Sequence, residues 1–199
     1  MEVGKLTELR IVSGHPALDL ANTVAPRQPG TAQLEFLSNP AALLQWAHQV
    51  GVVEAADVHR IEHSWSRSPG AAQAALADVL DLRNLVDHTL AGQDLDRLSR
   101  RWAVAINRSV LLPANGGAVT LSIGTDPTSM IADRLTDALV DLLRNADLSR
   151  LRACPLDEGG CGWLFLDRSR NLSRRWCSMD DCGAHVKARR LTERRRANR

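Results

Sequence analysis

Apolar side chains recur at helical spacing through most of the first 149 residues. Asn39-Pro40 suits the cap and first position of a helix. Leu43, Trp46 and Val50 then fall on one face, and Gly51 ends the pattern. The same spacing predicts further helices over residues 55–65, 71–91, 94–106 and 126–146. The expected fold class is therefore mainly α.

The period changes to two between Ser109 and Ile123. Two short apolar runs, residues 110–112 and 119–123, flank Asn115-Gly116-Gly117, which is a strong hairpin signal. This predicts one small β-hairpin within the helical region.

The first 30 residues contain one conspicuous string, Gly14-His15-Pro16-Ala17-Leu18-Asp19-Leu20-Ala21-Asn22-Thr23-Val24. Its spacing predicts a short helix with Asp19 and Asn22 on one face. Two interpretations stay open at this point. The polar groups cap the helix and satisfy buried backbone groups, or His15, Asp19 and Asn22 line a small-molecule pocket.

All four cysteines lie in the last 46 residues, with the spacing C-x6-C-x15-C-x4-C. We predict that Cys154, Cys161, Cys177 and Cys182 bind one zinc ion on two tight turns. Strands at residues 163–166 and 174–177 would form a hairpin between the two pairs, and a helix would follow Cys182-Gly183. This layout is typical of a treble-clef-like zinc finger with four cysteine ligands. A closed four-thiolate site predicts a structural zinc, not a catalytic one. Two alternatives to this four-cysteine zinc site stay open: unligated or redox-active thiols, and a site in which His185 replaces one of the cysteines.

Length and composition limit the number of domains and the classes of protein to which the chain can belong. The chain has 199 residues with 44% hydrophobic content, enough for one ordinary domain and a small appendage. We divide it into a helical domain over residues 1–149 and a zinc finger over residues 150–199. The sequence shows no membrane span and no secretory signal, which predicts a cytoplasmic protein. It shows no arrangement of nucleophile and base, so no enzyme is expected.

The net charge of +2 hides an asymmetry. Residues 150–199 hold 13 Lys and Arg against 6 Asp and Glu, whereas residues 1–149 hold 12 against 17. A basic end on an acidic body predicts a polyanionic partner, with arginines binding phosphates. A solvated tail, RNA and an acidic protein are the alternatives to DNA. The predicted nucleic-acid contacts are Arg168, Arg170, Arg174, Arg175, Lys187, Arg189, Arg190, Arg194 and Arg195.

Several strings of the sequence resemble two known families. Cys161-Gly162-Trp163-Leu164-Phe165-Leu166-Asp167, with Ser173-Arg174-Arg175-Trp176-Cys177-Ser178-Met179 and Cys182-Gly183, is similar to the CGNR zinc-finger family. The string from Gly14 to Thr23 resembles the opening of the ABATE domain that precedes that finger. The resemblance implies a bacterial, stress-induced transcription regulator with a mainly helical ABATE domain and a DNA-binding finger.

The chain departs from the family pattern at two places. Ala184 and His185 replace the Asn and Arg of the CGNR signature. Asp157-Glu158-Gly159-Gly160 widens the first cysteine pair and adds two acids near the metal, which would weaken phosphate attraction there.

From these observations we predict a DNA-binding transcriptional regulator. Its N-terminal domain would sense a small-molecule effector or form a homodimer, and its finger would contact DNA through the basic helix and hairpin. The runner-up is a zinc-stabilised module that binds a protein or RNA. An enzyme that uses the N-terminal pocket is a third hypothesis, without a supporting sequence feature.

Overall fold

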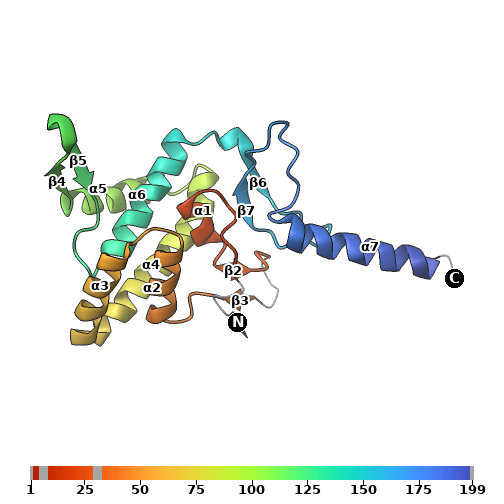
Figure 1. Cartoon of the computed structure of the whole chain (residues 1–199), viewed down its shortest axis with the longest axis horizontal. Coiled ribbons are helices and arrows are strands. Elements are labelled where there is room, and N and C mark those ends of the chain that lie inside the picture. Colours follow the sequence, from red (N-terminus) through yellow and green to blue (C-terminus); the bar gives the residue numbers. More distant parts are fainter. Residues whose placement is uncertain (1, 5–8, 29–32, 198–199) are drawn as a thin grey trace. The chain divides into compact units, whose positions relative to one another are not determined.

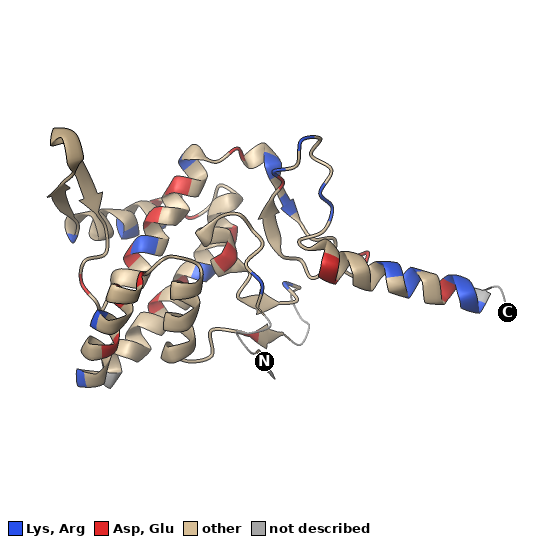
Figure 2. Cartoon of the chain, in the orientation of Figure 1, with Lys and Arg blue, Asp and Glu red and all other residues tan. Residues whose placement is uncertain are grey.

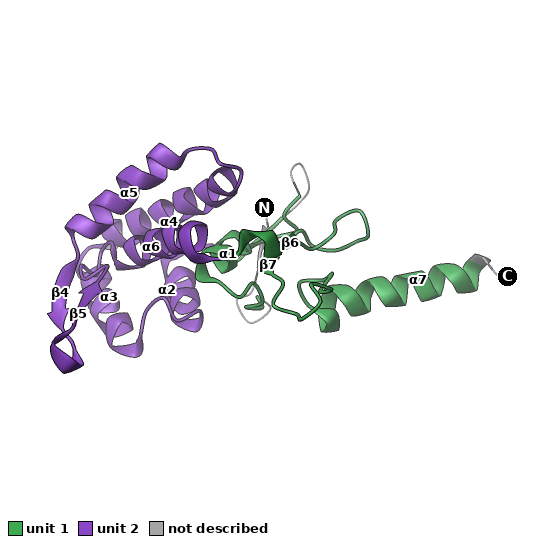
Figure 3. Cartoon of the chain, turned by 90° about the horizontal axis from the view of Figure 1, so that it is seen from above, with its two compact units in different colours: residues 1–36, 147–199 green, residues 37–146 purple. Residues whose placement is uncertain are grey.

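The computed structural model describes residues 2–4, 9–28 and 33–197 (Figure 1). Contacts divide the chain into two compact units (Figure 3). Unit 1 combines residues 1–36 with residues 147–199, and unit 2 comprises residues 37–146. Packing therefore groups the first 36 residues with the finger. The division predicted from the sequence, into residues 1–149 and 150–199, separates them. That division into domains stays a prediction.

Unit 2 consists mainly of five helices, at or near the predicted positions. Its core contains Trp46, Ile61, Leu82 and Leu139, all fully buried. No helix in the described part of the chain is long and apolar enough to cross a membrane. The helices are α2 (Pro40–Gln49), α3 (Ala55–Arg67), α4 (Pro69–Leu90), α5 (Leu95–Asn107) and α6 (Met130–Asn145).

The helix starts follow local side-chain chemistry. The Asn39 side chain accepts a hydrogen bond from the Ala42 N–H at 2.9 Å, as the capping pattern predicts. Helix α6 begins at Met130 and not directly after Asp126-Pro127. The Asp126 carboxylate accepts hydrogen bonds from the N–H and hydroxyl of Thr128, and this turn delays the helix.

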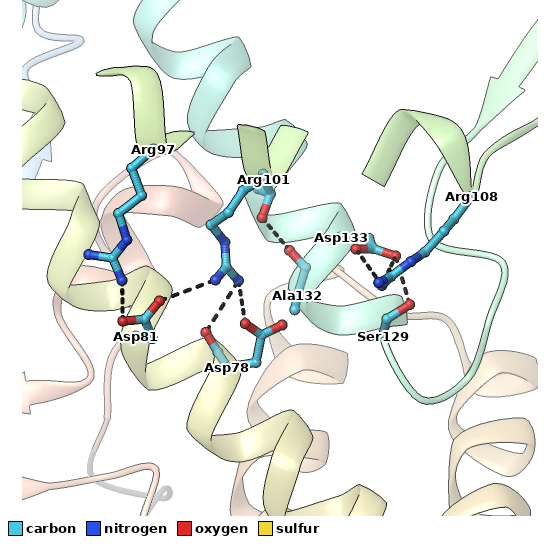
Figure 4. Close-up of polar contacts among 9 residues, drawn as sticks. Asp78, Asp81, Arg97, Arg101, Arg108, Ser129, Ala132 and Asp133 are labelled. Atoms are coloured by element: carbon cyan, nitrogen blue, oxygen red, sulfur yellow. Dashed lines mark hydrogen bonds and ion pairs between the residues drawn. The ribbon is translucent and has the colours of Figure 1, made fainter. Parts of the chain in front are cut away.

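Charged side chains of α5, and of Arg108 directly after it, make contacts with α4 and α6 (Figure 4). Arg101 lies 2.8 Å from Asp78 and 3.2 Å from Asp81 on α4. Arg108 lies 3.4 Å from Asp133 on α6, which also accepts a hydrogen bond from the Ser129 hydroxyl. These contacts hold α5 and the residue that follows it against α4 and α6.

The predicted hairpin is present in unit 2. Strands β4 (Val110–Pro113) and β5 (Val119–Ser122) pair in antiparallel register, with Leu111 opposite Leu121. Gly116 and Gly117 have φ values of 76° and 81°, which the turn requires and which glycine adopts without strain.

Apart from the long helix α7, unit 1 is built from short elements. Helix α1 (Pro16–Ala21) is the short helix predicted near the start of the chain. A π-helical turn at Met179–Gly183 leads into α7 (Ala184–Ala197), the basic helix. The strands are β1 (Glu2–Val3), β2 (Val24–Ala25), β3 (Leu34–Glu35), β6 (Leu151–Ala153) and β7 (Leu164–Leu166). The first three form one sheet in the order β1-β3-β2.

The predicted return strand at residues 174–177 is wrong. Strand β7 pairs with β6, so that Arg152 lies opposite Phe165. The Asp167 carboxylate explains the difference, because it accepts hydrogen bonds from the N–H groups of Ser169 and Arg174 and closes a loop. The residues after this loop are positioned by side-chain contacts and, within the described part of the chain, form no backbone hydrogen bonds with a neighbouring strand.

Candidate metal centre and nucleic-acid interface

The four cysteines converge in unit 1 from three segments. Cys154 follows β6 and Cys161 precedes β7, whereas Cys177 precedes the π-helical turn before α7 and Cys182 lies within that turn. All four Sγ atoms lie within 4.8 Å of one another. The Sγ atoms of Cys161 and Cys177 are 3.4 Å apart, and those of Cys177 and Cys182 are 3.7 Å apart.

These separations fit one tetrahedral zinc ion. With Zn–S bonds of about 2.3 Å, tetrahedral sulfurs lie about 3.8 Å apart. A disulfide would need about 2.05 Å, and all four cysteines are free. The group can therefore hold one zinc ion, and four thiolates would leave no coordination position open for catalysis.

The local backbone adapts to this cluster. Gly160 packs against the first ligand, because a Cβ there would lie 2.7 Å from the Sγ of Cys154 and 2.7 Å from the carbonyl oxygen of Pro155. Gly159 has a φ of 89°. The two glycines thus allow the wide x6 spacer to close as a tight turn.

The sulfurs also perturb one another electrostatically. Hydrogen bonds from the neighbouring thiols, first that of Cys161, lower the pKa of Cys154. The contact with Cys154 in turn raises the pKa of Cys161 and of Cys177. Four thiolates this close together would repel one another, and a bound cation such as zinc would offset that repulsion.

The N-terminal segment completes the finger. Asn22 is buried and makes two hydrogen bonds of 2.8 Å to the backbone of Leu164, one to the carbonyl oxygen and one from the N–H. The Leu166 N–H donates to the carbonyl oxygen of Ser13 at 2.8 Å. The Trp163 indole N–H donates to the Val24 carbonyl oxygen at 2.9 Å. Segment 13–24 therefore covers the edge of β7 that β6 leaves free.

The predicted ligand-pocket residues have structural contacts in unit 1. His15 caps α1, with its Nδ1 accepting from the Ala17 N–H at 3.3 Å. Burial raises the pKa of Asp19, and hydrogen bonds from Ser13 oppose that rise. These residues and Asn22 cap the helix and form hydrogen bonds with backbone groups, as the first of the two interpretations states. Their role in ligand binding stays a prediction.

A cavity of about 470 Å³ lies beside the metal centre within unit 1. Two metal-site cysteines line it together with Asp181 and His185, and most of the other residues are apolar. None of the predicted pocket trio borders it. Its lining residues are Ala25, Pro26, Gln33, Leu34, Gly159, Gly160, Cys161, Asp181, Cys182 and His185.

Two of the predicted nucleic-acid contacts help to build the fold. Arg174 lies over the Phe165 ring, 4.4 Å from its centroid, and donates to the Val12 carbonyl oxygen at 2.9 Å. Arg168 donates to the Gly14 carbonyl oxygen at 2.8 Å. Both side chains thus tie the finger to the N-terminal segment.

The other predicted contacts fall into two groups. Arg175, Arg189 and Arg190 all bind Glu158. The second group is exposed and forms no ion pair within the described residues; it comprises Arg170, Lys187, Arg194 and Arg195, along with Arg196. Basic residues follow one another along α7 in Figure 2.

Sequence reasoning missed Asp167, which is fully buried. Hydrogen bonds from the Ser169 hydroxyl, and then from the N–H groups of Ser169 and Arg174, lower the pKa of Asp167. The signal was the Asp-x-Ser pattern at residues 167–169, which is typical of a carboxylate that closes a local turn.

Fold and site together define a helical protein that carries a zinc-binding module with four cysteine ligands. Residues 150–195 match the CGNR zinc finger family, and residues 14–146 match the ABATE family, described as "Putative stress-induced transcription regulator". The chain belongs to the ABATE family, whose model spans well over half of its length, and it carries a CGNR zinc finger. No curated protein matches the chain. The resemblance found in the sequence is confirmed, and neither family description names an enzymatic activity.

The metal centre leads to the first prediction. Protein purified without chelator contains one zinc per chain, and Cys182→Ser loses the metal because one thiolate is missing. His185→Ala is the control and retains zinc, since four sulfurs already converge. Metal analysis checks both variants. Zinc-free wild-type protein, or loss of zinc in His185→Ala, would contradict the assignment.

A second prediction concerns Asn22. Asn22→Asp keeps the acceptor for the Leu164 N–H but places an oxygen against the Leu164 carbonyl oxygen. We expect the free energy of unfolding to fall by about 2 kcal/mol, with faster amide exchange at Leu164 and faster zinc release to a chelator. Asn171→Asp, an exposed site in the finger, serves as the control. Equal behaviour of the two variants would refute the role of Asn22.

Proposed function

We propose that this protein is a DNA-binding transcription regulator in which a structural zinc finger presents α7 to the phosphate backbone. The observation that carries the proposal is the exposure of α7. Val186 is the one buried side chain among residues 184–196 of this helix. A helix without a broad apolar face gains little from packing, so most of its side chains, apart from Val186 and the arginines that bind Glu158, are available to a partner.

The charges of α7 indicate what that partner is. Residues 184–196 hold six Lys and Arg and one Glu. Lys187, Arg190 and Arg194 follow the i, i+3, i+7 spacing of one helical face. Such a row matches the repeating negative charge of a nucleic-acid backbone, and arginine binds phosphate with two parallel hydrogen bonds.

In this proposal the metal has a purely structural role. Cys154, Cys161, Cys177 and Cys182 bind zinc and fix the turn from which α7 starts. Zinc adds folding energy to unit 1, because it holds together the segments that carry the four cysteines. A DNA partner places the protein with the bacterial chromosome, hence in the cytoplasm. Sensing of a small-molecule effector remains part of the proposal without an assigned site.

The DNA proposal gives a third prediction. Binding to genomic DNA fragments weakens steeply as salt rises, with a log–log slope of roughly −0.9 per phosphate contact. Removal of residues 183–199 abolishes binding, whereas Leu95→Lys, which adds a charge in unit 2, leaves it nearly unchanged. Fluorescence anisotropy at several salt concentrations measures both effects.

Three results would contradict DNA as the partner. They are salt-independent binding, binding by the truncated chain, and a clear preference for RNA or for an acidic protein over DNA. The last result would favour the runner-up, a zinc-stabilised interaction module.

We further propose that the hairpin of unit 2 is the homodimer surface. Leu111 and Val119 are 66% and 65% exposed, and Leu121 beside them is 43% exposed. Residues 109–123 contain no charged residue in a chain that is 24% charged. An isolated two-stranded hairpin with an exposed apolar face is marginally stable in water.

The backbone favours a second copy of the same hairpin as its cover. The Ala114 N–H donates to the Ala118 carbonyl oxygen, so Val119 and Leu121 direct their backbone groups outward. The outer edge of β4 is blocked where Pro113 lacks an N–H, which leaves β5 as the open edge. Two uncharged β5 edges can pair antiparallel about a two-fold axis and join their apolar faces.

The fourth prediction tests this surface. Val119→Lys shifts the protein from dimer to monomer, because the new charge is exposed in the monomer and buried in the dimer. Leu95→Lys introduces the same charge at another exposed apolar position of unit 2 and keeps the dimer. Sedimentation equilibrium determines the mass. A wild-type monomer at all concentrations, or a dimer of Val119→Lys, would refute the proposal.

A further inference from the structure

Three arginines of the predicted DNA surface converge on Glu158. The two carboxylate oxygens accept hydrogen bonds from Arg175 and from Arg190, the latter at 2.8 Å. The Glu158 carbonyl oxygen accepts a hydrogen bond from Arg189 at 2.7 Å. The arginines come from different segments, since Arg175 precedes Trp176 and the other two lie on α7.

The arrangement matches what a phosphate group would receive. Two guanidinium groups donate to the two oxygens of one anion, which is how arginines bind both carboxylates and phosphates. The Glu158 side chain is 18% exposed, whereas those of Arg175 and Arg190 are 58% and 52% exposed. Both arginine side chains are therefore partly accessible from solvent.

We propose that Arg175 and Arg190 form a phosphate-binding site that the Glu158 carboxylate occupies in the free protein and a DNA phosphate takes over on binding. This inference rests on the proposed function and deepens it. It assigns Glu158 the role of an internal competitor that tunes DNA affinity.

The exchange needs only the side chain of Glu158 to move. Arg189 holds the loop through the Glu158 carbonyl oxygen, independently of the carboxylate. Gly159 leaves room for that contact, because a Cβ there would collide with the Arg189 guanidinium group. The loop thus stays attached to α7 while the carboxylate leaves.

The competitor is charged at neutral pH. The hydrogen bond from Arg175, together with the charges of Arg175 and Arg190, lowers the pKa of Glu158 below its usual range. A DNA phosphate must therefore displace an ion pair. Each phosphate contact so gained raises the affinity roughly 8-fold when the salt concentration falls from 1 M to 0.1 M.

The experiment compares Glu158→Gln with Asp157→Asn in the full-length, zinc-loaded protein. Both variants remove one negative charge from the same loop. Asp157 is exposed and forms no ion pair with the described residues, so its variant frees no arginine. Fluorescence anisotropy with the same DNA fragment, at several salt concentrations, measures affinity and slope.

We expect Glu158→Gln to bind DNA about tenfold more tightly than wild type at 0.1 M salt, with a steeper salt slope. Asp157→Asn should stay within about twofold of wild type, because a surface charge without a partner is largely screened. Arg190→Gln added to Glu158→Gln should cancel the gain, because the freed site then lacks one guanidinium group.

Circular dichroism and zinc content establish that each variant is folded. Equal affinities of Glu158→Gln and Asp157→Asn, or weaker binding by Glu158→Gln, would overturn the proposal while leaving DNA binding by the wild type intact. A gain that survives Arg190→Gln would overturn it as well. If wild type and Glu158→Gln both fail to bind DNA, the proposed function falls together with this inference.

Discussion

The structure of unit 1 depends on one constraint. One edge of a very short strand has, among the described residues, no neighbouring strand to accept and donate its backbone hydrogen bonds. Strand β7 has three residues, and β6 pairs with only one of its edges. The other edge would leave backbone groups without partners inside the unit, at a cost that a small unit cannot offset. Asn22 and the Ser13 carbonyl oxygen satisfy that edge from the far end of the chain.

This constraint explains how the chain is organised. The finger and the N-terminal segment form one unit, and residues 37–146 are inserted between its two halves. Such an insertion costs little, because the entropy of closing a loop grows only with the logarithm of its length. The signature that opens the ABATE domain is therefore also a structural part of the zinc finger that follows it.

The arginines of the finger also differ in what they contact. Arg168 and Arg174 bind backbone carbonyl groups and build unit 1. Arg175 and Arg190 are paired with Glu158, while the end of α7 stays exposed to solvent. Counting basic residues measures the electrostatic attraction of the finger, but only the contacts show which of them are available to a partner.

The sequence by itself determined what depends on local patterns. The 3.6-residue period, the Asn39 cap and the Asn115-Gly116-Gly117 turn each specify their element through neighbouring residues, and the cysteine spacing specifies the metal. Only the tertiary structure decided the partner of β7 and the contacts of Asn22 and Glu158. These contacts join residues that are far apart in the chain, and such contacts produce no periodic pattern in the sequence.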